Sequence, residues 1–276
     1  MPEPHEIDLF TAIVLGAVQG VTEFLPISSD GHIALFAMLF GQAHMPLSMV
    51  VLLHVGTLIA TFLVFREDIA QLTRSTLDGL RTPRPFLETP EGRCVAAIIV
   101  ATIPTAVIGL ALRDAVEEWS HVPWIVGLCL LGTAAVIAST RHTAQRATRP
   151  STDIPLSHAL LIGVAQGLAV LPGLSRSGST IACAMLLGTM GPAAFRFSFL
   201  MSLPAVLGAV VLELRHPGDV LHELGVTALA GAFVAFGVGL ASLFLLRNLV
   251  DRGRFWAFSL YLVPLGLGLI AWDMTR

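Results

Sequence analysis

Two polar segments interrupt an otherwise apolar chain and carry most of its candidate chemistry. The first, GAVQGVTEFLPISSDGH, covers residues 16–32, and the second, GVAQGLAVLPGLSRSGST, covers residues 163–180. A charged side chain at mid-membrane costs roughly 2.5–3.5 kcal/mol on insertion scales, so a Glu, His or Arg there indicates a functional site. Both segments begin with Gly-x-x-Gln-Gly, contain a Leu-Pro step and end in a Ser/Gly-rich turn. This duplication predicts two halves that meet at one site, unless it reflects only the Gly, Pro and Ser bias of membrane helices.

In the first segment, Glu23 follows Gln19 by four residues. On a helix the two side chains therefore share one face and can point into one cavity. The pair could contribute to binding a divalent cation, because hard cations such as Mg²⁺ or Ca²⁺ take oxygen ligands. Glu23 could instead orient His32, or form a hydrogen bond between helices.

The loop after Pro26 gathers polar side chains in a row. Ser28, Ser29 and Asp30 stand directly before Gly31 and His32, where a new helix would begin. One of the three is expected to cap that helix. Three such residues followed by a histidine exceed what capping requires, so the loop predicts a binding or catalytic site.

The second segment has the groups that bind phosphate oxygens. Arg176 supplies a planar cationic fork, and Gly173 and Gly178 leave backbone N–H groups accessible. The hydroxyls around them are those of Ser175, Ser177, Ser179 and Thr180. The alternative is that Arg176 only neutralises an acid such as Glu23.

The composition indicates an integral membrane protein. The chain is 55% hydrophobic and 13% charged, with a mean hydropathy of +0.80, whereas soluble domains are about 25% charged. A net charge of −3 gives no indication of a nucleic-acid partner. Cys94, Cys129 and Cys183 lie singly in apolar runs and are expected to be packing residues. The N-terminus lacks the basic region of a cleavable signal, so we expect the first apolar segment to be retained.

The apolar runs predict an all-α membrane fold with six spans and two re-entrant helical hairpins. A span needs about 20 residues, and the qualifying runs are 47–65, 94–112, 122–140, 195–212, 225–246 and 255–272. Two pairs of shorter runs, 8–25 with 33–40 and 156–171 with 181–190, are each broken by Pro and a Ser/Gly cluster. Such breaks are tolerated only where backbone is buried in protein or lines a wet cavity, which favours hairpins over 8–40 and 156–190.

Arginine placement predicts an inverted repeat. The Arg-rich connections 66–93, 141–152 and 247–254 should be cytoplasmic, and 113–121 and 213–224 should face outward. With three spans in each half, residues 156–276 repeat residues 1–140 upside down, joined by a cytoplasmic linker at 141–155. In such folds the N-termini of interrupted helices can face an anionic group near the midplane.

Four stretches together resemble the undecaprenyl-diphosphate phosphatase family of the bacitracin-resistance type. They are LGAVQGVTEFLPISSDGH (15–32), HVGTLIATFLVFRED (54–68), PGLSRSGST (172–180) and RFSFLMSLPAVLGA (196–209). The resemblance implies hydrolysis of a polyprenyl diphosphate, undecaprenyl diphosphate, to the lipid monophosphate and inorganic phosphate. That reaction recycles the lipid carrier of cell-wall synthesis. The resemblance also implies a divalent cation and a multi-pass protein of the bacterial inner membrane, with its site toward the periplasmic or outer face.

The same resemblance implies roles for individual residues. Ser29 matches the family's nucleophile and His32 the base or acid beside it, although His32 could equally activate water. Glu23 and Arg176 complete the implied catalytic set. The residues implied to bind substrate are Gln19, Ser28, Ser175, Ser177, Gly178 and Thr180.

Three positions depart from the family pattern. Gln19 stands where many members have Glu, Asp30 stands where a small hydroxyl residue is common, and Leu262 follows Tyr261 where a Tyr-Arg pair is expected. Asp30 could join Glu23 as a metal ligand, or could repel a diphosphate. The sequence leaves open a homodimer and, as the alternative function, a transporter or flippase of a prenyl phosphate or another anionic lipid.

Overall fold

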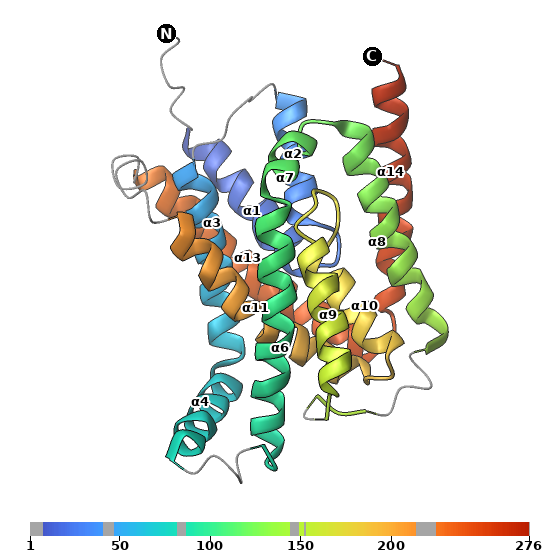
Figure 1. Cartoon of the computed structure of the whole chain (residues 1–276). Helices are drawn as coiled ribbons and strands as arrows, with labels where there is room; N and C mark the ends of the chain where they lie inside the picture. Colours follow the sequence, from blue (N-terminus) through green and yellow to red (C-terminus); the bar gives the residue numbers. More distant parts are fainter. Residues whose placement is uncertain are drawn as a thin grey trace.

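A computed structural model of the chain describes residues 8–40, 47–81, 87–143, 149–151, 153–213 and 225–275. Within these ranges the regular structure is helical, apart from one isolated bridge between Arg149 and Thr189. Figure 1 shows the helices gathered side by side into a bundle with both termini at one end. The predicted all-α fold is confirmed.

Two pairs of short helices form the predicted hairpins. α1 (Leu9–Phe24) and α2 (Ser29–Phe40) run in from the end that carries the termini and back, and α9 (Leu156–Leu168) and α10 (Arg176–Leu186) do the same from the opposite end (Figure 1). Their loops meet in the middle of the molecule. α2 begins four residues earlier than the predicted run at 33–40, because Ser28 caps it.

Five helices of the described chain are long and apolar enough to cross a membrane. They are α6 (Pro90–Ala111), α8 (Pro123–Thr143), α11 (Gly191–Glu213), α13 (Val226–Asp251) and the last helix, in which a 3₁₀ turn (Phe255–Phe258) leads into α14 (Ser259–Met274). The sixth predicted span corresponds to α3 (Leu47–Val64), which bends by 75° into α4 (Arg66–Arg81). α4 lies within a stretch that we expected to be only a connection.

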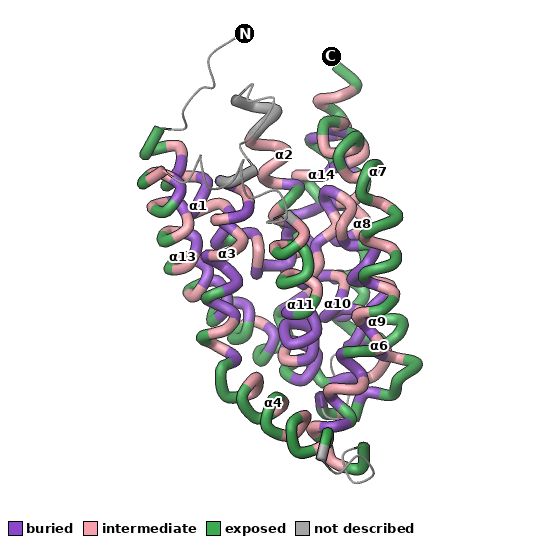
Figure 2. Tube along the Cα trace, turned by 60° about the vertical axis from the view of Figure 1, so that its left-hand side comes forward, coloured by how far each residue is buried: buried purple, intermediate pink, exposed green. Residues whose placement is uncertain are grey.

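The surface of the bundle is that of a protein in lipid. On α6 the exposed side chains Ile99, Ile103, Val107 and Leu110 form one stripe at helical spacing. Figure 2 shows buried positions concentrated at the centre, around α10 and α11, and exposed positions along α4 and the outer helix faces. α4 carries charged residues at both ends, which suits a helix lying at the membrane boundary rather than across it.

The arrangement agrees with an inverted repeat. α4, the end of α8 and the end of α13 lie at the end of the bundle opposite the termini, while α7 (Arg113–Trp119) lies at the same end as the termini (Figure 1). α1 packs on α13, and its counterpart α9 packs on α6. The Arg-rich connections therefore share one end, as predicted. The boundaries of the two halves stay a prediction.

The repeated Gly-x-x-Gln-Gly motif is explained by these two helix contacts. A Cβ on Gly16 would lie 2.3 Å from the carbonyl oxygen of Gly231 in α13, and a Cβ on Gly163 would lie 2.2 Å from that of Ala101 in α6. Gly20 and Gly167, one turn later, are similarly close to the same two partner helices. Two small residues four positions apart let helix backbones approach closely in a membrane. The motif thus fixes how deeply the last turns of α1 and α9 lie in the bundle.

We predict that Gly163→Ala destabilises the protein by about 1–3 kcal/mol, because the added methyl group meets backbone atoms that cannot move away. Thermal unfolding of the purified protein in detergent checks this. Gly237→Ala on α13 is the matched control, since a methyl group at that position would have nothing within 4 Å, and better helix propensity should leave it neutral or slightly stabilised. Equal melting temperatures for both variants would contradict the packing role.

Candidate active site

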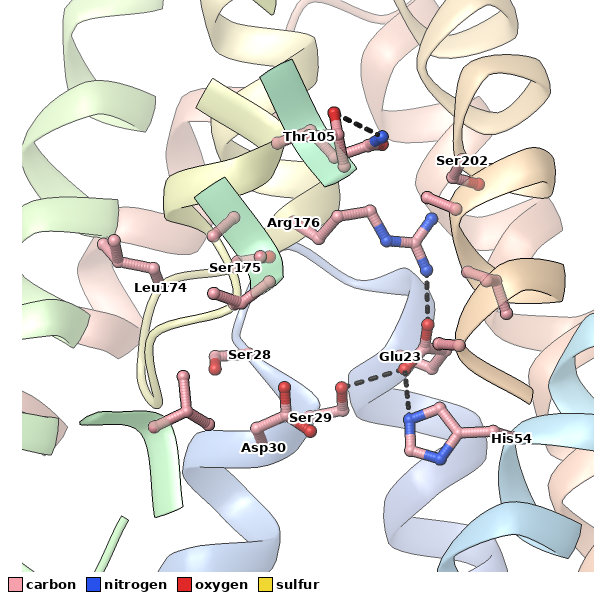
Figure 3. Close-up of a pocket in the computed structure, with 18 of the residues that line it drawn as sticks. Glu23, Ser28, Ser29, Asp30, His54, Thr105, Leu174, Ser175, Arg176 and Ser202 are labelled. Carbon is pink, nitrogen blue, oxygen red and sulfur yellow. Dashed lines mark hydrogen bonds and ion pairs between the residues drawn. The ribbon is translucent and has the colours of Figure 1, made fainter. Parts of the chain in front are cut away.

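A cavity of about 520 Å³ lies where the two hairpin loops meet. Figure 3 shows Glu23, Ser29, Asp30 and Arg176 beside one another in it, together with His54 from α3. Residues of α6, α7 and α11 complete the walls. The structure therefore brings the two polar segments to one place, as their duplication predicts.

Glu23, in the last turn of α1, is the centre of the polar contacts. Its Oε1 accepts a hydrogen bond from the guanidinium of Arg176, the first residue of α10. Its Oε2 accepts one from the hydroxyl of Ser29, the first residue of α2, at 2.9 Å, and one from the Nε2 of Gln19 at 3.1 Å. The sequence analysis gave neutralisation of an acid such as Glu23 as the alternative role of Arg176, and the structure contains this ion pair. Because Ser29 shares the same carboxylate, the pair also lies directly beside a hydroxyl in the cavity.

Ser28 and Ser175 cap the second helix of each hairpin in the same way. The Ser28 Oγ accepts from the backbone N–H of Gly31, three residues later, and the Ser175 Oγ accepts from that of Gly178. The expectation that one of the loop residues caps α2 is confirmed for Ser28. Both serines also line the cavity.

A single hydroxyl joins the two loops. The Ser28 Oγ accepts a second hydrogen bond, at 3.2 Å, from the N–H of Gly173 in the other hairpin. Ser28 has a φ of 71°, a conformation uncommon outside glycine, and this turn is what directs its side chain to Gly173. The loops are thus held together before any ligand arrives.

α8 fixes the second loop from behind. The Thr133 hydroxyl donates to the carbonyl of Gly173 at 3.1 Å and accepts from the N–H of Ser175 at 3.0 Å. Gly173 has a φ of 98°, and a Cβ there would lie 2.4 Å from the carbonyl oxygen of Val126. Only glycine fits this turn.

His32 lies beside the cavity and is not among the residues that line it. Its Nδ1 bonds to the Ser28 carbonyl at 2.8 Å, so that nitrogen carries the proton. Its Nε2 meets the Tyr261 hydroxyl at 2.8 Å, and the two rings stack. Leu262, where the family pattern led us to expect arginine, is fully buried in the core. The predicted proton-transfer role of His32 stays a prediction.

His54 is a cavity residue to which the sequence analysis gave no role. Its Nδ1 donates to the carbonyl of Val50 at 2.9 Å, and its Nε2 lies 3.8 Å from the Glu23 Oε2. It was detectable as an ionisable residue within a predicted span, which alone suggests function. Its distance from Glu23 could not be predicted, because that distance depends on how α3 packs against α1.

The two glutamines of the repeated motif are buried, and in each of them only the amide nitrogen has a hydrogen-bond partner among the described residues. The Gln19 amide donates to Glu23, and the Gln166 amide donates to the Thr105 hydroxyl at 3.2 Å. The Oε1 atoms of both are buried without a hydrogen-bond partner among the residues that the structure describes. Gln166 lines the deep end of the cavity, and Gln19 does not line it.

Three residues predicted to bind substrate lie behind the cavity wall. Ser177 contacts the Ser175 hydroxyl, the N–H of Gly178 is taken by the Ser175 cap, and the Thr180 hydroxyl lies against the Arg176 carbonyl and Ser198. None of the three lines the cavity. In this structure they shape the turn that presents Arg176, and phosphate contacts by them stay a prediction.

The electrostatics of the cavity favour an anion. α2 and α10 both begin at it, so the positive ends of two helix dipoles face one point. The Arg176 guanidinium lies beside them, paired with Glu23, and Asp30 places a carboxylate in the same cavity. A phosphate group there would meet a cation, two helix N-termini and the Ser29 hydroxyl.

Phenylalanines form a layer between this cavity and the Arg-rich end. Phe24, Phe65, Phe195 and Phe199 pack against one another with ring centroids 4.9–5.9 Å apart. The Arg176 guanidinium lies 6.0 Å from the centre of the Phe199 ring. Beyond the layer, Phe65 and Phe195 line a separate cavity.

Comparison with known proteins places the chain in a family. It matches the family described as bacitracin resistance protein BacA over residues 12–268. The undecaprenyl-diphosphatase of Treponema denticola is 40% identical over 271 residues, which cover 95% of this chain and 97% of that protein. The undecaprenyl-diphosphatase of Korarchaeum cryptofilum is 37% identical over 269 residues, covering 96% and 99%. The match is nearly end to end and includes both hairpins, and the chain therefore belongs to the BacA bacitracin-resistance family.

Proposed function

We propose that this protein hydrolyses undecaprenyl diphosphate to undecaprenyl phosphate and inorganic phosphate in the cavity between the two hairpins. One observation carries the proposal: Glu23 binds a hydroxyl from one hairpin and a guanidinium from the other. This juxtaposes a nucleophile, an acceptor for its proton and a cation for phosphate. The names of the relatives support the substrate.

Arg176, Ser29 and Glu23 have distinct roles in phosphoryl transfer, which needs mainly positioning and charge neutralisation. Arg176 and the two helix N-termini hold the terminal phosphate. The Ser29 oxygen attacks its phosphorus while the hydroxyl proton passes to Glu23, 2.9 Å away. The bond to the bridging oxygen breaks, and the lipid phosphate leaves. Water then hydrolyses the phosphoserine and restores the enzyme.

The divalent cation fits Asp30 better than Glu23. Protein donors already occupy both Glu23 oxygens, and the described residues include no group of three or more His, Cys, Asp or Glu that could hold a metal. Asp30 is exposed and lines the cavity. Mg²⁺ commonly binds through one or two carboxylates plus substrate phosphates, so Asp30 would hold the ion together with the diphosphate. The ion would neutralise phosphate charge.

The prenyl chain would leave the cavity along its apolar wall. α11 contributes Ala205, Val206, Ala209 and Val210, and Val50 and Val51 of α3 lie among the same lining residues. Among the described residues of α13, none lines the cavity. The first isoprene units would therefore contact α3 and α11.

The cavity would open to the outer side of the cytoplasmic membrane. Its lining reaches α7, at the end of the bundle that carries the termini, and the Arg-rich connections lie at the other end (Figure 1). The positive-inside rule then assigns the mouth to the outside.

Ser29→Ala should reduce phosphate release from a prenyl diphosphate to background, because the attacking oxygen is gone. Glu23→Gln should lower kcat by about 10²–10⁴-fold, since the proton acceptor is lost. Ser242→Ala is the control, because Ser242 lies on α13 away from the cavity and bonds only to its own helix. Release of phosphate from the purified enzyme is the measurement. A Ser29→Ala enzyme that retains most of its activity would show that water attacks directly.

Asp30→Asn should raise the Mg²⁺ or Ca²⁺ concentration needed for half-maximal activity, because the amide binds the cation more weakly. Initial rates measured against cation concentration test this. Asp114→Asn, an exposed carboxylate near the mouth that does not line the cavity, should leave the curve unchanged. An unaltered curve for Asp30→Asn would exclude it as the cation ligand.

Cysteines placed at each end test the orientation. In a background with Cys94, Cys129 and Cys183 replaced by alanine, Glu117→Cys on α7 should react with a membrane-impermeant maleimide added to intact cells. Arg74→Cys on α4 should react only after the membrane is permeabilised. The reverse pattern would place the cavity mouth in the cytoplasm.

A further inference from the structure

A second arginine lines the cavity and has no role in the scheme above. Arg113 is the first residue of α7, and it is exposed. With the residues that the structure describes, its guanidinium forms neither an ion pair nor a hydrogen bond. Arg176, by contrast, is paired with Glu23. Arg113 is therefore a cation in the cavity whose charge is available to a ligand.

The two arginines lie at different depths. Thr105, Gly109, Arg113 and Val116 follow one another along α6 and α7 at spacings of three or four, and all of them line the cavity. Thr105 is at the deep end, near Arg176 and hydrogen-bonded to Gln166 (Figure 3). Arg113 comes eight residues later, beyond the end of α6 at Ala111, as the first residue of α7 and on the side of the mouth. The cavity thus has an inner cation, Arg176, and an outer cation, Arg113.

The charges in the cavity favour a second protein cation near the mouth. Glu23 cancels the charge of Arg176, and Asp30 adds a negative charge. A diphosphate brings at least two more negative charges on two adjacent phosphates. The inner cation and the helix N-termini can serve the terminal phosphate. The second phosphate, on the side of the mouth, would share the divalent cation proposed at Asp30, and Arg113 is the lining arginine whose charge is left to pair with it.

We propose that Arg113 binds the phosphate that stays on the prenyl chain, and that it makes the enzyme select diphosphates over monophosphates. This rests on the proposed function. When the terminal phosphorus is transferred to Ser29, the bridging oxygen keeps the electron pair and the lipid phosphate gains negative charge. Arg113 pairs with that developing charge. A lipid monophosphate can occupy only one of the two cation positions, so the product is held weakly and is not cleaved further.

The test compares two inhibitors of farnesyl diphosphate hydrolysis by the purified full-length enzyme. Methylenediphosphonate carries two phosphorus centres and spans both cations, whereas orthophosphate fills only the inner position. Arg113→Gln should weaken inhibition by methylenediphosphonate about 10–100-fold, the usual loss of a charge-assisted contact, and change inhibition by orthophosphate less than about twofold. It should also lower kcat/KM for farnesyl diphosphate.

Three further variants make the result decisive. Arg113→Lys keeps the charge and should restore much of the selectivity. Glu117→Gln changes the charge of the same short helix at a position that does not line the cavity, and should match the wild type. Arg176→Gln should weaken both inhibitors, and if it weakens neither, the proposed site itself is wrong. If Arg113→Gln folds with the wild-type melting temperature and keeps the wild-type ratio of the two inhibition constants, the role of Arg113 is excluded.

Discussion

The site depends on one carboxylate held in the interior of a membrane protein. Burying a charged group is costly unless it is paired and hydrogen-bonded, and Glu23 meets that requirement with partners from both hairpins, Ser29 and Arg176. The same bonds that stabilise Glu23 bring the hydroxyl and the guanidinium together. Stability and chemistry therefore share one set of contacts, and removing any partner leaves an uncompensated polar group.

The internal duplication explains why Ser29 and Arg176 occupy equivalent positions in the two hairpins although their side chains differ. Ser28 and Ser175 cap α2 and α10 through the same bond to a glycine three residues later. The residue after each cap opens its helix: Ser29 in one half, Arg176 in the other. One backbone geometry, used twice in opposite directions, thus presents a hydroxyl and a cation to the same carboxylate. Glycines of the repeated motif set the depth of both hairpins.

The hairpins could be predicted because their signal is local. Pro26 and Pro172 break the helices, polar residues follow, and a membrane gives such residues few alternatives to clustering. The cap of α2 was expected among Ser28, Ser29 and Asp30, and Ser28 provides it, whereas the apolar run at 33–40 marked only the apolar part of that helix. The positions of His54 and Arg113 at the cavity and the contact between His32 and Tyr261 could not be predicted, because they depend on how α3, α7 and α14 pack against the hairpins. Spacing along the chain carries no information about that packing.

The phenylalanine layer has a consequence for the cell. A polar chamber that reaches deep into a bilayer is a potential leak for ions, and aromatic rings packed against one another lie on the side of Arg176 toward the Arg-rich end. On the proposed scheme, inorganic phosphate forms above this layer and departs on the side from which the lipid headgroup entered. Hydrolysis on this scheme therefore releases inorganic phosphate on one side of the membrane.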